Sequence, residues 1–125
     1  MHNIRKIARI LLGLILIVFG LNAFYDFMGL PQMPEEARRV YDYMGYMIMY
    51  AVMFQMLAGL LLLLNRFVPL ALLVMAPISL NILAFHLFFF PAGILPGLIV
   101  AVLNVFLLIQ YRDFFKPFLR SNPDK

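Results

Sequence analysis

The sequence contains no cysteine, and only two of its 125 residues are histidine. Without thiolates the chain can form no disulfides, iron–sulfur clusters or thiolate metal sites. Charge is scarce as well, because charged residues make up 13% of the chain, against about 25% in soluble domains. A soluble domain of this length could not bury 65% apolar residues, since small domains expose much of their surface. With a mean hydropathy of +0.95, the composition indicates a membrane protein and excludes a water-soluble enzyme.

Three long stretches of the chain carry no charged residue. They run from Ile10 to Tyr25, from Tyr43 to Asn65 and from Phe67 to Tyr111. The last, of 45 residues, would be about 68 Å long as one helix, roughly twice the thickness of a bilayer core of about 30 Å. It must therefore fold back, and the cluster of Pro and Gly at residues 91–97 marks the turn.

Backbone polar groups in lipid need internal partners, so the apolar stretches are expected to form helices. We predict an all-α membrane protein whose residues 1–125 form a single integral membrane domain. Its core is a bundle of four transmembrane helices. The predicted spans lie at about residues 7–28, 45–64, 68–89 and 95–111. Pro77 lies inside the third span and should kink it, freeing a carbonyl one turn earlier.

The basic residues predict the orientation of these spans. Eight of the ten lie on one side of the predicted membrane: Arg5, Lys6, Arg9, Arg66, Arg112, Lys116, Arg120 and Lys125. Only Arg38 and Arg39 lie on the other side. The positive-inside rule therefore puts both termini in the cytoplasm. Because these cations flank spans, the net charge of +4 is assigned to topology, and no nucleic-acid partner is expected.

Two segments outside the spans are expected to lie at the membrane surface. Pro34 is followed by Glu35 and Glu36, and Glu35 is spaced i,i+4 from Arg39, which predicts a short outer interfacial helix before the second span. Residues 112–125 mix aromatic and basic side chains. This composition is typical of a cytoplasmic interfacial anchor.

Polar side chains inside the spans are the candidates for a site, since burying them in lipid is costly. Five stand out: Asn22, Gln55, Asn81, His86 and Asn104. Together they come from all four spans at roughly similar depth. One interpretation is interhelical hydrogen bonding, worth about 0.6 kcal/mol per bond. The other is a joint ligand site, in which case Asn22, Gln55 and Asn81 should point into the bundle and lie near one another.

His86 is the most informative of the five. It lies among Phe85 and residues 88–90, all Phe, and a neutral imidazole there can donate to a carbonyl or accept from a hydroxyl. That chemistry suits a quinone headgroup, whereas a structural hydrogen bond is the competing interpretation. Ser79 lies on the same helix face, while Asn81 is about 140° away. One His and no carboxylate pair in the spans predict neither a metal site nor a bis-His haem.

Four segments, at residues 9–24, 58–72, 81–86 (NILAFH) and 111–115 (YRDFF), are similar in order and spacing to the DoxX family. The resemblance covers nearly the whole chain. It implies a small four-helix protein of the bacterial inner membrane, associated with membrane oxidoreductase complexes and with quinone. Family members often carry Glu where this chain has Gln55, and an amide cannot relay protons as a carboxylate does.

Three functions remain open at this point. The first is a redox-associated, multi-pass membrane subunit that holds quinone, and this accessory role is favoured over a self-sufficient enzyme. The second is a structural or assembly subunit of a membrane complex. A small transporter is the third, although no mid-membrane carboxylate supplies a cation site. Each of these implies contact with the lipid bilayer and either protein partners or a homo-oligomer.

Overall fold

The computed structural model describes residues 2–25, 33–119 and 121. These residues form five α-helices: α1 (His2–Tyr25), α2 (Glu35–Met44), α3 (Tyr46–Leu64), α4 (Val68–Phe88) and α5 (Ile94–Gln110). Three short 3-10 helices follow α4 and α5: η1 (Pro91–Gly93), η2 (Arg112–Phe114) and η3 (Lys116–Leu119). The all-α class is therefore confirmed.

Three helices of the described chain are long and apolar enough to cross a membrane, at Tyr46–Leu64, Val68–Phe88 and Pro91–Gln110. They coincide within a few residues with the second, third and fourth predicted spans. The first predicted span, 7–28, starts within α1, which itself begins five residues earlier at His2. A helix need not start at the edge of the lipid, since its first turn is equally satisfied by water. The predicted end at Met28 lies outside the described residues.

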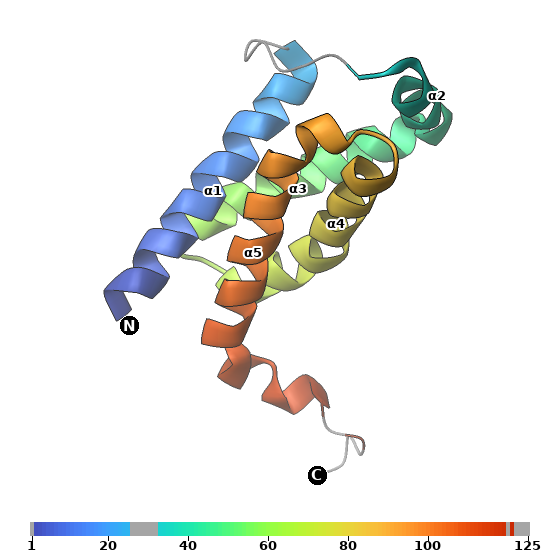
Figure 1. Ribbon diagram of the computed structural model, residues 1–125. Helices are drawn as coiled ribbons and strands as arrows, with labels where there is room; N and C mark the ends of the chain where they lie inside the picture. Colours follow the sequence, from blue (N-terminus) through green and yellow to red (C-terminus); the bar gives the residue numbers. More distant parts are fainter. Residues whose placement is uncertain (1, 26–32, 120, 122–125) are drawn as a thin grey trace.

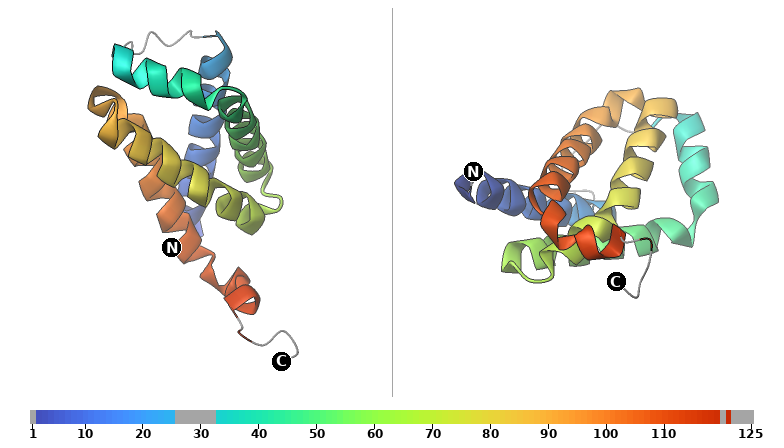
Figure 2. Two further views of the ribbon diagram at one scale, coloured as in Figure 1. Left: turned by 90° about the vertical axis from the view of Figure 1, so that its right-hand side faces the viewer. Right: turned by 90° about the horizontal axis from the view of Figure 1, so that it is seen from below.

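α1, α3, α4 and α5 form a bundle, and α2 lies across one end of it (Figure 1). The beginning of α1 and the end of α5 lie together at the opposite end (Figures 1 and 2). The predicted short helix before the second span is thus present as α2. It starts after Pro34, with Glu35 and Glu36 in its first turn, as the helix dipole favours.

α1 and α3 pack closely because two glycines meet at their crossing. A Cβ atom built on Gly13 would lie 3.0 Å from the Gly59 carbonyl oxygen, and one on Gly59 would lie 2.9 Å from that of Gly13. Glycine pairs of this kind bring membrane helices into backbone contact. One turn before Gly13, the buried Arg9 side chain donates to the Leu62 carbonyl in the last turn of α3. Carbonyls at a helix C-terminus lack intrahelical donors, so the guanidinium caps this end.

The turn between α3 and α4 is tight. Asn65 and Phe67 both have positive φ, at 57° and 52°, and the Arg66 N–H donates to the Leu61 carbonyl at 3.0 Å. This bond closes α3 in the manner of a Schellman motif. Pro69 lies in the first turn of α4, where a backbone N–H has no acceptor within the helix, so the missing N–H of proline costs no hydrogen bond. α4 therefore starts directly after the turn and returns along α3.

The core between the helices is small, and much apolar surface points outward. Leu12, Leu16, Leu62, Leu72 and Leu107 are fully buried, whereas many Leu, Met and Phe side chains on the outer faces are exposed. This arrangement fits a lipid environment. Beyond α5, Lys116 pairs with Asp113 at 3.0 Å, and this hydrogen bond and charge hold the pKa of the exposed Asp113 carboxyl below its usual value.

Candidate ligand-binding cavity

A cavity of about 690 Å³ lies beneath α2, at the end of the bundle opposite the start of α1. Its walls come from all five helices and from the link between α4 and α5. Small-molecule sites typically occupy about 300–1,000 Å³ and are mostly apolar with a few convergent polar groups. The lining follows this pattern, with Leu16, Phe19, Ile82, Phe90 and Val100 among its apolar members.

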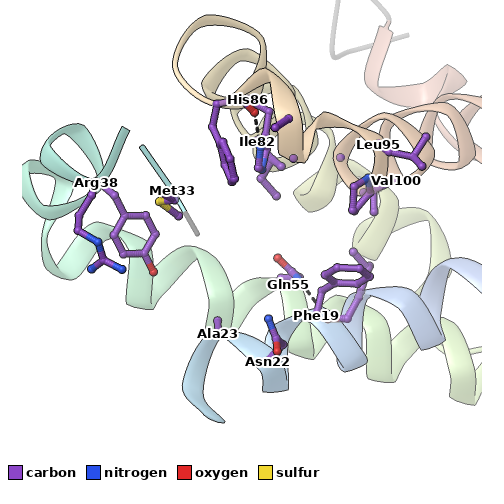
Figure 3. A pocket seen from close by; sticks show the side chains of 17 residues that line it. Phe19, Asn22, Ala23, Met33, Arg38, Gln55, Ile82, His86, Leu95 and Val100 are labelled. Carbon is purple, nitrogen blue, oxygen red and sulfur yellow. Dashed lines mark hydrogen bonds between the residues drawn. The ribbon is translucent and has the colours of Figure 1, made fainter. Parts of the chain in front are cut away.

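Gln55 supplies one polar group of the cavity from α3. Its side chain is 9% exposed, and its Nε2 donates to the Leu16 carbonyl of α1 at 2.9 Å. A carbonyl can only accept, so the nitrogen must face Leu16 and the Oε1 atom is turned the other way. Figure 3 shows this oxygen pointing into the cavity, where it offers an acceptor.

His86 faces Gln55 and Asn22 from the opposite wall, on α4 (Figure 3). Its Nδ1 lies 3.3 Å from the Phe90 carbonyl oxygen. That oxygen has no proton to give, so Nδ1 carries the proton in this hydrogen bond and Nε2 of the neutral ring is an acceptor. The Phe85 and Phe90 rings, each with its centroid 5.6 Å from that of the imidazole, hold the ring in place.

Two glycines at the start of α5 leave room for the imidazole. A Cβ on Gly93 would lie 3.2 Å from His86 Cε1 and 2.8 Å from a Phe90 ring carbon. A Cβ on Gly97 would lie 3.7 Å from His86 Cδ2 and 3.2 Å from an Ile82 side-chain carbon. Nε2 is bonded to both of these ring carbons, so larger residues at either position would crowd the acceptor atom.

The remaining polar lining comes from α1 and α2. The partly buried Asn22 points toward the cavity from α1, close to Gln55 (Figure 3). Arg38 and Tyr41 of α2 lie at the rim with Met33, and the Arg38 side chain is exposed there. These three residues were not predicted from the sequence, because their position at the cavity depends on α2 folding back over the end of the bundle.

The structure brings together three of the five predicted site residues, namely Asn22, Gln55 and His86. Asn104 does not line the cavity: it is 2% exposed, and its Nδ2 donates to the Leu72 carbonyl of α4 at 3.3 Å. Asn81 is exposed on the outer surface of α4, so the prediction that it points into the bundle was wrong. The physical reason is the 140° between Asn81 and His86, which turns one outward when the other faces inward.

The cavity can therefore hold a mostly apolar molecule by its polar end. Two of its lining residues carry acceptor atoms, His86 Nε2 and Gln55 Oε1, which match hydroxyl donors on a ligand. Among the described residues, no group of three or more His, Asp or Glu side chains could hold a metal ion.

Comparison with protein-family models, with characterised proteins and with solved structures found no match to this chain. The similarity to the DoxX family therefore stays a prediction from the four sequence segments.

Proposed function

We propose that the chain is a DoxX-like, four-span protein of the bacterial inner membrane with both termini in the cytoplasm. α1 is the additional span, since its residues from Ile10 to Tyr25 carry no charge. Support for the orientation comes from the end of the bundle where α1 begins and α5 ends, because the basic residues Arg5, Arg66 and Arg112 gather there. The cavity then opens toward the outer leaflet.

The function that this geometry favours best is binding of a quinol headgroup by an accessory subunit of a membrane oxidoreductase. The observation that carries the proposal is the pair of acceptors, His86 Nε2 and Gln55 Oε1, on opposing walls of an apolar cavity. The two hydroxyls of a quinol lie at opposite ends of a flat ring, so each meets one wall. Phe19 and Phe90 give the ring apolar contact, and Asn22 adds an amide to the same lining.

A bound quinol supplies two electrons and two protons to a redox partner. The residues of this chain bind and orient its head, keep water away from it and accept hydrogen bonds from its hydroxyls. The resemblance of four sequence segments to the DoxX family, which is associated with membrane oxidoreductases, agrees with this role.

The test is to purify the protein in mild detergent without oxygen, extract it and measure quinol and quinone by mass spectrometry. We expect near-stoichiometric quinol in the wild type and a loss of most of it in His86→Ala. Asn81→Leu is the matched control, because it also removes a polar side chain of α4 but faces away from the cavity. Quinol retained by His86→Ala, or absent from the wild type, would contradict the proposal.

A structural or assembly role is the second candidate, and one observation favours it. Asn104 and Gln55 both donate to backbone carbonyls of a neighbouring helix, which is how polar residues hold membrane helices together. Under this alternative, both His86→Ala and Asn104→Ala lower the melting temperature, and neither changes the ligand content.

A further inference from the structure

Asn81 lies on the outer face of α4 in an otherwise apolar surface. Its neighbours there include Leu73, Leu80 and Phe88, which are 49%, 68% and 75% exposed. Within the described residues, the Asn81 amide forms no hydrogen bond. It lies seven residues from the end of α4, or about 10 Å into the helix at 1.5 Å per residue. The surrounding lipid would therefore offer it no partner.

Pro77 lies on the same outer face, because a spacing of four residues is about 40° around the helix. Proline has no N–H, so the Leu73 carbonyl does not receive the usual bond from residue 77. Leu73 is itself exposed, four residues before Pro77. One stripe of α4 thus presents an amide and a carbonyl with spare hydrogen-bonding capacity to a medium that cannot supply donors.

We propose that a second copy of this chain covers the stripe, with the two α4 helices packed in parallel about a twofold axis along the membrane normal. Asn81 of each copy then lies opposite Asn81 of the other at the same depth. A carboxamide carries both a donor and an acceptor, so two identical amides related by a twofold axis satisfy each other. A single Asn in an apolar helix seam sets register and partner number in the same way in coiled coils.

Self-association explains the composition of the stripe better than a different partner does. An unrelated helix would have to present a polar group at the matching depth, whereas a copy of this chain does so by symmetry. Ala84 lies three residues after Asn81 on the same face and is small enough to let two helices approach closely. The cavity side chains lie on the other side of α4, so this interface and ligand binding are independent.

The chain has no cysteine, which allows a direct test by single-cysteine crosslinking in membranes. Ala84→Cys should give disulfide-linked dimers on mild oxidation. Val102→Cys, on the exposed face of α5, is the matched control and should stay monomeric. Adding Asn81→Leu to Ala84→Cys should reduce the yield of dimers several-fold. Equal crosslinking of Ala84→Cys and Val102→Cys, or an undiminished yield of dimers in the double variant, would overturn the proposal.

A second measurement compares the wild type, which has no cysteine, with substitutions at Asn81 alone. In detergent, Asn81→Leu should weaken dimerisation by about 5- to 30-fold, and Asn81→Gln should recover part of it. The melting temperature and quinol content of the monomer should stay the same, because Asn81 is exposed and forms no hydrogen bond with the described residues of its own chain. Two results would contradict the second-copy model. One is a wild type that is monomeric at all concentrations. The other is a wild type that binds a different protein stoichiometrically and loses that protein in Asn81→Leu.

Discussion

Gln55 of α3 is hydrogen-bonded through Nε2 to the Leu16 carbonyl of α1, over 2.9 Å, at a point where both residues also line the cavity. This one bond joins two helices and orients an acceptor toward a ligand. The structural and binding roles of Gln55 belong to different atoms of its amide: Nε2 holds the Leu16 carbonyl, and Oε1 offers the acceptor.

Replacing Gln55 by Met should therefore have two effects. Loss of the bond to Leu16 should destabilise the protein by about 0.6–1.7 kcal/mol, the range for hydrogen bonds between membrane helices. Loss of the Oε1 acceptor should weaken quinol binding by about 5- to 150-fold. Thermal unfolding and a binding titration measure the two. Leu57→Met, on the exposed face of α3, is the control and should change neither. A variant with lowered stability but unchanged affinity would remove Gln55 from the site.

Gly59→Ala should loosen the crossing of α1 and α3. The added Cβ would lie 2.9 Å from the Gly13 carbonyl oxygen and 3.1 Å from the Leu16 Cβ, and backbone cannot move aside as a flexible side chain can. We expect a loss of about 1–3 kcal/mol in stability. Leu60→Ala, the next residue along and exposed, should change stability by less than about 0.5 kcal/mol. Equal effects of the two variants in thermal unfolding would show that the crossing tolerates a methyl group.

Arg9 should matter more than Arg5, although sequence alone treats both as flanking charges. Arg9 is 6% exposed and donates to the Leu62 carbonyl, whereas Arg5 lies over the Tyr111 ring at 4.6 Å from its centroid. We expect Arg9→Ala to cost about 1.5–3 kcal/mol and Arg5→Ala about 0.5–1 kcal/mol. Chemical denaturation in detergent would rank them. The reverse order would mean that the Arg9 contact adds little.

The membrane orientation is tested with reporter fusions. A reporter active only in the periplasm should be inactive after Lys125 and active when inserted near Pro34, just before α2. This pattern follows from four spans and from the basic residues at the end of the bundle opposite α2. The inverse pattern would place the cavity mouth on the cytoplasmic side, and activity at both positions would mean an even number of spans between Pro34 and Lys125, where the account has three.

The sequence predicted the helices better than it predicted the cavity. Charge-free stretches and the breakers at residues 91–97 locate α3, α4 and α5 within a residue or two, because the cost of a charge in lipid depends mainly on depth. Depth does not specify direction, so Asn81 and His86 were grouped although they lie on different faces of α4. Their five-residue spacing, about 140° around the helix, already indicates that the two side chains point in different directions. Arg38 and Tyr41 could not be predicted, since their place at the rim depends on how α2 folds over the bundle.

The central claim is that the acceptors His86 Nε2 and Gln55 Oε1 select a ligand with hydroxyl donors. The most direct measurement is a titration of the purified protein without oxygen with duroquinol and with duroquinone, which share one ring and differ only in two hydrogens. The account predicts that duroquinol binds at least about fivefold more tightly, and that His86→Ala removes most of this preference. Equal affinity for the two forms, or tighter binding of duroquinone, would contradict it.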